Sequence, residues 1–235
     1  MRMILMTLFS VLIMSGSVYA REKLVLTTLD SHLNAVVGVN ILREAYQRIG
    51  IQIETKILPA ERALHMANKG KFDGEVIRIR EVQELYPNLR RVPVPVIAME
   101  GVVFTKDVTF DVTGWESLKP YTIGILIGSK FIEKGTRGLT VEAVPTYKQV
   151  LLKLNAGRTD VAVMARTNGL IELRKLNMKG IRVLEPPLVK ARLYHYLHKK
   201  NEHLIPQIAQ VLKNMVEEGR PKEIWDQSIA ESGRR

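Results

Sequence analysis

Cysteine is absent from the 235-residue sequence. Its absence excludes a disulfide framework, a thiolate metal site, a cysteine nucleophile and the lipid anchor of a lipoprotein. Aromatic residues make up only 6%, and the Lys and Arg residues behind the formal charge of +11 are scattered along the chain. A nucleic-acid-binding surface needs clustered basic residues, so we expect no nucleic-acid partner. An acidic ligand or an anionic membrane surface is compatible with the charge.

Long apolar runs are missing as well. The apolar run at residues 4–14 is about half as long as the roughly 20 residues that span a bilayer. Arg2 precedes this run, and Val18-Tyr19-Ala20 follows it as a small-x-small cleavage pattern. We therefore expect residues 1–20 to be a cleaved signal peptide and the protein to be periplasmic. Removing 20 of the 235 residues leaves 215, which suits one large domain or two lobes of about 100 residues each.

Strands and helices alternate from the start of the remaining chain. The continuous apolar centre of residues 23–28 predicts a buried strand, and helical spacing follows over 34–49. Alternating isoleucines predict a second strand over 51–58, and Pro59 stands where the next helix begins. This order favours an α/β fold with right-handed parallel crossovers.

An internal echo is the most informative pattern. Residues 68–76 read Asn-Lys-Gly-Lys-Phe-Asp-Gly-Glu-Val, and residues 155–163 read Asn-Ala-Gly-Arg-Thr-Asp-Val-Ala-Val. Each copy follows an amphipathic helix and precedes an apolar strand, so the Gly is expected to cap the helix and the Asp to occupy the turn. Two lobes of similar build explain the echo most simply. The alternative is that any helix-to-strand turn has this pattern.

The remaining elements continue the same order. We expect a strand over 121–127, a short helix over 130–134, a helix that starts at the Thr146 capping box, a strand over 191–198 and two closing helices.

This order of elements and the paired turns resemble the family 3 extracellular solute-binding proteins, which include the amino-acid-binding subunits of ABC transporters. The lead into residue 124 from Trp115, the helix start at 199–204, and Leu58-Pro-Ala-Glu-Arg-Ala-Leu64 followed by Asp73-Gly74-Glu75 are similar to a shorter branch of that family. The resemblance implies a two-lobed, type II periplasmic-binding-protein fold. Each lobe would be a mostly parallel sheet flanked by helices. Lobe 1 would comprise residues 21–103 and 192–235, lobe 2 residues 104–191, and strands 100–106 and 191–198 would form the hinge.

The resemblance also implies the function. A small polar solute would be trapped between the lobes by hinge closure and handed to a transporter permease, or the closed form would be read by a membrane receptor. No cofactor and no metal are implied, and we expect a monomer.

Loops at the carboxyl ends of strands supply the candidate site residues. They are Asp30, Ser31, Glu61, Arg62, Glu75, Arg78, Glu100, Gly128, Ser129 and Arg166. Backbone N–H groups at Gly128-Ser129 would attract a carboxylate. Arg78 and Arg166 would grip an anion from the two lobes. Glu75 and Glu100 would receive an ammonium group or neutralise the arginines.

Two departures from the amino-acid-binding relatives bear on the solute. Those relatives carry Ser or Thr shortly after the first-lobe Asp, and an acid five residues beyond the second-lobe Asp. Here Asp73 is followed by no such hydroxyl, and the second position is Ala165. A standard α-amino acid is therefore disfavoured, and an anionic or otherwise altered solute is favoured.

Catalysis and metal capture are the two rival functions. Some proteins of this fold are dehydratases, in which Glu75 or Glu100 would act as general acid or base. Against an enzyme, the sequence has no Gly-x-Ser-x-Gly elbow, no His-Glu-x-x-His and no phosphate loop. His195, His198 and His203 lie close in sequence and suggest metal capture, but positions three apart on a strand face opposite sides, so His195 and His198 cannot easily share one ion. We expect a binding protein and no catalysis.

Overall fold

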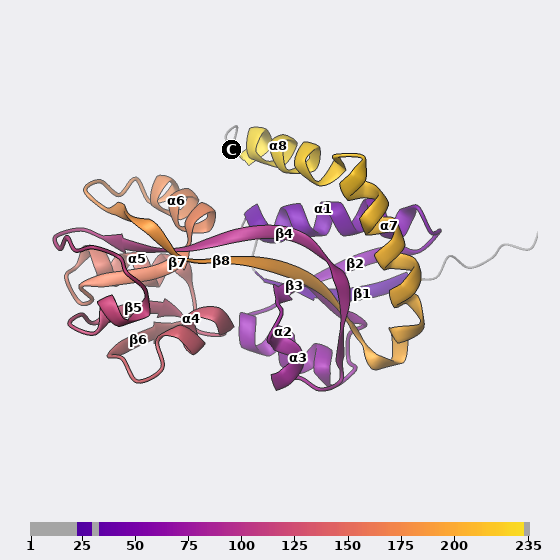
Figure 1. The fold of residues 1–235 in the computed structure, drawn as a ribbon, viewed down its shortest axis with the longest axis horizontal. Helices are drawn as coiled ribbons and strands as arrows, with labels where there is room; N and C mark the ends of the chain where they lie inside the picture. Colours follow the sequence, from indigo (N-terminus) through magenta and orange to yellow (C-terminus); the bar gives the residue numbers. More distant parts are fainter. Residues whose placement is uncertain (1–22, 30–32, 233–235) are drawn as a thin grey trace, which may run out of the picture.

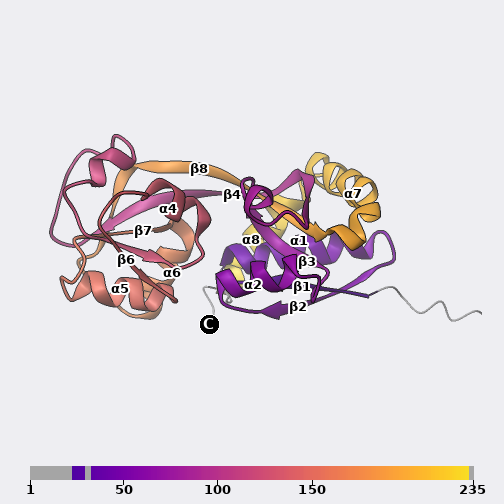
Figure 2. The ribbon, with the colours of Figure 1, turned by 90° about the horizontal axis from the view of Figure 1, so that it is seen from below.

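The computed structural model describes residues 23–29 and 33–232. The predictions for residues 1–20, Asp30 and Ser31 lie outside this part of the chain. Two lobes stand side by side and are joined by two long strands (Figures 1 and 2). The predicted two-lobed α/β fold is confirmed. Within the described residues, no helix has both the length and the apolar character that crossing a membrane requires.

The first lobe opens with two strand and helix units. Its elements are β1 (Lys23–Thr28), α1 (Leu33–Gln47), β2 (Gln52–Ile57), α2 (Ala60–Asn68), β3 (Gly74–Ile79) and α3 (Val82–Leu85). β1 pairs in parallel with both β2 and β3. Because the chain returns to the same sheet edge through α1 and α2, the carboxyl ends of β1 and β3 meet at one side of the lobe.

The second lobe repeats this plan in the middle of the chain. Its elements are η1 (Trp115–Leu118), β5 (Ile123–Leu126), α4 (Lys130–Gly135), β6 (Val141–Val144), α5 (Tyr147–Asn155), β7 (Val161–Ala165) and α6 (Arg166–Lys175). β5 pairs in parallel with β6 and β7. The Thr146 hydroxyl accepts a hydrogen bond from the Gln149 N–H and caps α5, as the sequence predicts.

The two lobes share β4 (Leu89–Thr105) and β8 (Arg182–His198), which run antiparallel through both. One eight-stranded sheet results, in the order β2-β1-β3-β8-β4-β7-β5-β6. The strands predicted over 100–106 and 191–198 are therefore only parts of two 17-residue strands. After β8 the chain returns to the first lobe through η2 (Lys199–Leu204), α7 (Ile205–Glu217) and α8 (Arg220–Ser232).

Separate hydrophobic cores lie in the two lobes. Val96 and Ile97 of β4 belong to the first-lobe core, whereas Val102 and Phe104 belong to a second-lobe core. A further second-lobe cluster contains Val103 and lies on the other face of the sheet. The lobe limits at residues 103 and 192 stay a prediction.

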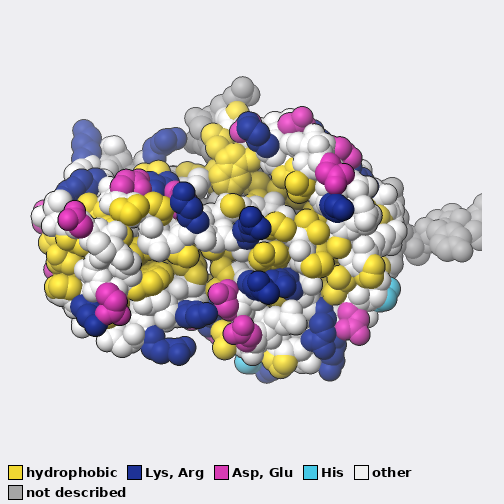
Figure 3. Space-filling view, in the orientation of Figure 1, with side chains coloured by type: hydrophobic (Ala, Val, Ile, Leu, Met, Phe, Trp, Pro, Cys, Tyr) yellow, Lys and Arg dark blue, Asp and Glu magenta, His cyan; other side chains and the backbone are white. Residues whose placement is uncertain are grey.

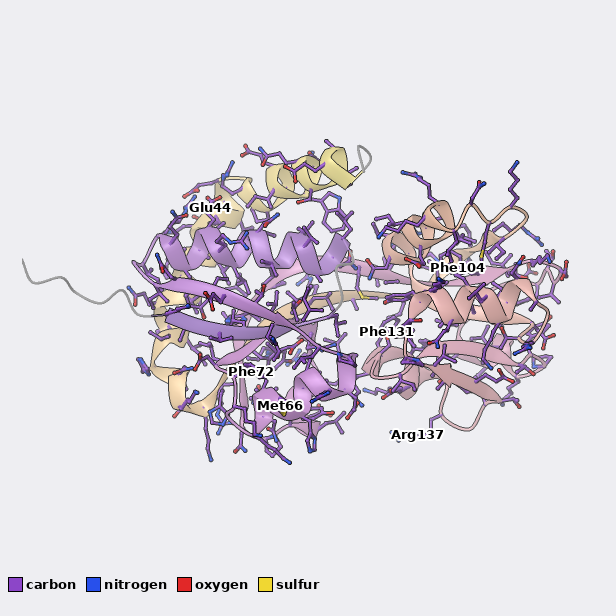
Figure 4. All side chains as sticks on the ribbon, turned by 180° about the vertical axis from the view of Figure 1, so that it is seen from behind. Glu44, Met66, Phe72, Phe104, Phe131 and Arg137 are labelled. Carbon is purple, nitrogen blue, oxygen red and sulfur yellow. The ribbon has the colours of Figure 1, made fainter. Side chains whose placement is uncertain are left out.

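The closing helix is tied to α1 by charge. Arg220 of α8 donates to both carboxylate oxygens of Glu44, at 3.2 and 2.9 Å. Glu44 lies on the side of α1 that faces α8 (Figure 4). Its hydrogen bond to Arg220 lowers the pKa of Glu44 against the opposing effect of burial. α8 thereby covers the first lobe.

Candidate functional site

A cavity of about 70 Å³ lies between the lobes. Its walls include Thr28, Ile79, Leu126 and Ala165, which are the last residues of β1, β3, β5 and β7. Ligands of open α/β sheets bind at this edge, outside the carboxyl ends of the strands. A single water needs roughly 10–15 Å³ by a comparable measure, so the cavity holds a molecule of a few heavy atoms.

Most of the wall is apolar, with a small number of polar groups placed around it. The apolar residues are Leu29, Ala35, Ile77, Ile79, Val82, Met99, Leu126, Phe131, Ala165 and Leu193, and the polar ones are Thr28, Asn34, Arg78, Ser129, Lys130, Tyr147 and Asn168. Apolar walls with a few directed polar groups are typical of small-molecule sites.

Arg78 brings a buried positive charge to the wall. Its side chain is 7% exposed, and its Nη2 lies 2.7 Å from Glu75 Oε1 and 3.2 Å from the Ala60 carbonyl oxygen. The contact with Glu75 is an ion pair rather than a well-directed hydrogen bond. Glu75 is fully buried on β3 and also accepts from the Thr27 hydroxyl. Burial raises the pKa of Glu75, although Arg78 and Thr27 act in the opposite direction. Glu75 thus neutralises Arg78 from behind.

Three buried polar atoms of the wall have no hydrogen-bond partner among residues 23–29 and 33–232. They are Asn34 Oδ1, Arg78 Nε and Asn168 Oδ1. All three side chains are at least nine-tenths buried. An unpaired buried polar atom costs about 1–3 kcal/mol, so a bound molecule that supplied its partner would be held favourably.

The lobes touch across the cavity. Lys130 of α4 pairs with Glu61 of α2 at 2.5 Å, and Lys134 of α4 pairs with Glu81 at 3.5 Å. Pairing with Glu61 and Glu133 raises the pKa of Lys130 to about 12 despite the opposing effect of burial. These bonds join α4 of the second lobe to the first.

Apolar contacts reinforce the junction. Phe131 lies between the lobes (Figure 4) and packs against the first-lobe core and a second-lobe cluster. Gly128 approaches α2 so closely that a Cβ there would be 2.6 Å from the Ala60 Cβ.

Some of the described candidate residues line the cavity, and others lie beside it or away from it. Gly128, Ser129 and Arg78 line the cavity. Glu75 lies behind Arg78, and Glu61 joins Tyr86 and Lys130 beside the cavity. Arg62 is exposed and does not line it.

Arg166 and Glu100 lie outside the cavity wall. Arg166 donates from Nε to Glu100 at 2.7 Å and from both other nitrogens to Glu185 at 2.6 and 2.9 Å. Lys190 approaches Glu100 at 3.5 Å. The two predicted arginines therefore do not face a common anion, because Arg166 is held by two carboxylates at the hinge strands.

The Gly128 N–H is not free for a ligand carboxylate. It donates to Glu133 Oε1 of the following turn, at 2.5 Å. The chain's own acid thus occupies the position that the sequence assigned to a solute anion.

The sequence interpretation did not identify three residues of the wall, Asn34, Tyr147 and Asn168, as site residues. Each stands in the first turn of the helix that follows a strand, namely α1, α5 and α6. A search of first helical turns, rather than strand ends alone, would have found them. Asn168 Nδ2 lies 3.5 Å from the Tyr147 hydroxyl, and burial raises the pKa of Tyr147.

His195 has a structural role in the first lobe. It is fully buried, bonded through Nε2 to the Tyr46 hydroxyl and through Nδ1 to the Glu75 carbonyl oxygen, each at 2.8 Å. In residues 23–29 and 33–232, no three His, Asp or Glu side chains gather as metal ligands would. On the face in Figure 3, basic side chains are dispersed among acidic and apolar ones.

Comparison with known proteins places this architecture in a class. No protein-family model matches the chain. An uncharacterised protein of Shewanella oneidensis is 27% identical over 190 residues, which cover 76% of this chain and 70% of the relative. An amino-acid ABC transporter substrate-binding protein of Streptococcus pneumoniae, solved with L-arginine, superposes with a TM-score of 0.73 at 12% identity, covering 89% of this chain and 95% of that one.

A histidine kinase sensor domain similar to periplasmic binding proteins also has a TM-score of 0.73, at 15% identity, with 88% and 96% of the two chains covered. The structural neighbours are thus substrate-binding proteins of amino-acid transporters and related sensor domains. The chain has the two-lobed fold of periplasmic binding proteins.

Proposed function

We propose that this protein is an exported periplasmic solute-binding protein of the family 3 type, which encloses a small polar solute between its lobes for an ABC-type transporter. The observation that supports this most directly is the cavity between the lobes, with unpaired polar atoms of Asn34, Arg78 and Asn168 in its wall. A bound solute would supply the missing partners and so favour the arrangement in which the lobes touch.

Hinge closure is the motion that this function requires. Among the described strands, only β4 and β8 run continuously through both lobes, and their pairing shifts register near residues 91–97 and 101–103. Irregular pairing allows a strand to bend, and a hinge needs only a few such residues. Opening would break the Lys130–Glu61 pair and expose the cavity.

Binding without catalysis fits the site better than a dehydratase. That reaction would need a cleft carboxylate as acid or base. Glu75 lies behind Arg78, and Glu100 is paired with Arg166, so both candidates are engaged outside the cavity wall.

A thermal-shift screen of residues 21–235 tests the proposal. The panel contains amino acids, hydroxy acids, dicarboxylates, amides, polyamines and small sugars. A solute that binds only the folded state raises the melting temperature with concentration. Small-angle scattering of the same protein, with and without the hit, should show a more compact particle with solute. No concentration-dependent shift from any compound would contradict the proposal.

A sensory role is the second candidate, favoured by the likeness to a histidine kinase sensor domain. In that case the solute-loaded protein would bind a receptor ectodomain rather than a permease. Crosslinking in the periplasm with and without the solute, followed by identification of the captured membrane protein, distinguishes the two.

Mass spectrometry of the exported protein tests the proposed signal peptide and should find Arg21 as its first residue.

A further inference from the structure

Asn34 and Asn168 approach the cavity from opposite lobes. Asn34 stands in the first turn of α1 and Asn168 in the first turn of α6. Both line the cavity, both are buried, at 5% and 6% exposure, and both have an unpaired side-chain oxygen. A ligand that satisfies both must therefore carry hydrogen-bond donors.

Arg78 imposes the opposite requirement. Its Nε is buried and has no acceptor within the part of the chain that the structure describes, and the Arg78 side chain lines the cavity. An N–H group only donates, so the ligand must present an acceptor to it. One ligand must consequently carry an acceptor toward Arg78 and donors toward the two asparagines.

The charge of the wall limits what kind of donor fits. Arg78 is neutralised by Glu75, and Lys130 by Glu61 and Glu133. Among the described residues of the wall, none carries a carboxylate. The described wall would give an ammonium group no counter-charge, and burying an unpaired ammonium costs far more than burying a hydroxyl or an amide N–H that finds an acceptor.

On the basis of the proposed solute-binding function, we infer that Asn34 and Asn168 select a solute whose donors are uncharged. The geometry points to a small hydroxy acid or carboxamide: its acceptor faces Arg78, its hydroxyl or amide N–H groups face the two asparagines, and a short apolar body fills the rest. The selection is made across the lobes, because each lobe supplies one acceptor.

Matched pairs of compounds test this inference. Glycerate, which carries two hydroxyl donors, differs from serine only in a hydroxyl in place of the ammonium group, and lactamide and alaninamide form a second pair. Isothermal titration of residues 21–235 should give at least about tenfold tighter binding for the uncharged-donor member of a pair.

A variant reverses the test. Asn168→Asp keeps the shape of the side chain and adds a negative charge, so the ammonium member should gain affinity and the preference should shrink or invert. Asn34→Asp makes the same test from the other lobe if the first variant folds poorly, as judged by circular dichroism. Asn155→Asp, at the exposed last residue of α5, is the matched control and should leave the preference unchanged.

The outcomes separate this inference from the proposed function. If wild-type protein binds serine or alaninamide as tightly as its partner compound, or responds only to polyamines, the inference is overturned while solute binding stands. If the aspartate variants keep the wild-type preference, the asparagines do not select the donor. If no compound of the pairs or of the wider panel binds, the solute-binding proposal itself fails.

Discussion

Asp73 and Asp160 make the same hydrogen bond in the two lobes. The Oδ2 of Asp73 accepts from the Val25 N–H in β1, and the Oδ2 of Asp160 accepts from the Thr122 N–H just before β5, both at 2.7 Å. In each lobe, the turn that leads out of an amphipathic helix is thereby tied to the lobe's first strand. The two copies of the sequence echo are thus equivalent in three dimensions.

The surroundings of the two aspartates differ, so their removal should differ in cost. Asp73 also pairs with Lys200 at 2.9 Å and accepts from Asn201, whereas Asp160 is exposed. We expect Asp73→Ala to lower the free energy of unfolding by about 2 kcal/mol and Asp160→Ala by about 1 kcal/mol. Urea unfolding measures both. The exposed Asp111→Ala is the control, with a change within about 0.5 kcal/mol.

The echo explains why the fold could be predicted. Gly70 and Gly157 both adopt a left-handed conformation, with φ of 73° and 65°. This local geometry is dictated by neighbouring residues, and it sets the order of helix, turn and strand. β1 begins and ends where the sequence predicts, whereas β4 and β8 extend well beyond the predicted hinge. Their length depends on pairing between distant segments, which local patterns do not encode.

The site was less predictable than the fold, because carboxylates of the chain itself bind the groups that the sequence assigned to a solute. The sequence predicted that Arg78 and Gly128 lie near the carboxyl ends of strands, and both are found there, in the cavity wall. It could not show that Glu75 would neutralise Arg78, that Glu133 would take the Gly128 N–H, or that Glu185 would hold Arg166. Glu185 and Arg166 are 19 residues apart, and their pairing depends on how β8 is placed in the sheet.

Arg78 should be required for the solute, and Arg166 should not. Arg78→Met removes the cation that is paired with buried Glu75, so it should cost about 3–5 kcal/mol of stability. The double variant Arg78→Met with Glu75→Gln removes both charges and should regain most of that stability. Titration should detect no solute binding by the double variant.

Arg166→Met should keep the wild-type affinity for the solute within about threefold. Loss of binding in Arg166→Met alone would contradict the placement of Arg166 outside the site.

Acid should destabilise the protein through His195. Burial lowers the pKa of His195 to about 4, from 6.5. The unfolded chain therefore takes up this proton as the pH falls through 6.5, while the folded chain resists until about 4. The stability contributed by neutral His195 is present above pH 6.5 and is lost between 6.5 and 4, by an amount on the order of 3 kcal/mol.

Glu75 titrates in the opposite sense, so the measurement must isolate His195. Its raised pKa means that the folded chain binds its proton more readily, which favours folding at low pH. Denaturant unfolding of wild type and of His195→Gln, compared at each pH, removes this common contribution. The glutamine retains a donor and an acceptor for Glu75 and Tyr46. The difference in stability between the two proteins should fall from pH 6.5 to 4, and a constant difference would refute the assignment. His65→Gln, at an exposed position, is the control.

Closure of the lobes should require a residue without a side chain at position 128, which is Gly128. Gly128 and Gly138 have nearly the same left-handed backbone, with φ of 81° and 82°, so alanine strains both by about 1–2 kcal/mol. They differ in space: a Cβ at Gly128 meets Ala60 at 2.6 Å and the Glu61 nitrogen at 2.7 Å, whereas nothing lies within 4 Å at Gly138. Gly128→Ala should therefore weaken solute binding at least about tenfold and remove the solute-induced compaction seen by small-angle scattering. Gly138→Ala should lose a similar amount of stability and retain both. Equal affinity in the two variants would show that the lobes need not approach through Gly128 for the solute to be held.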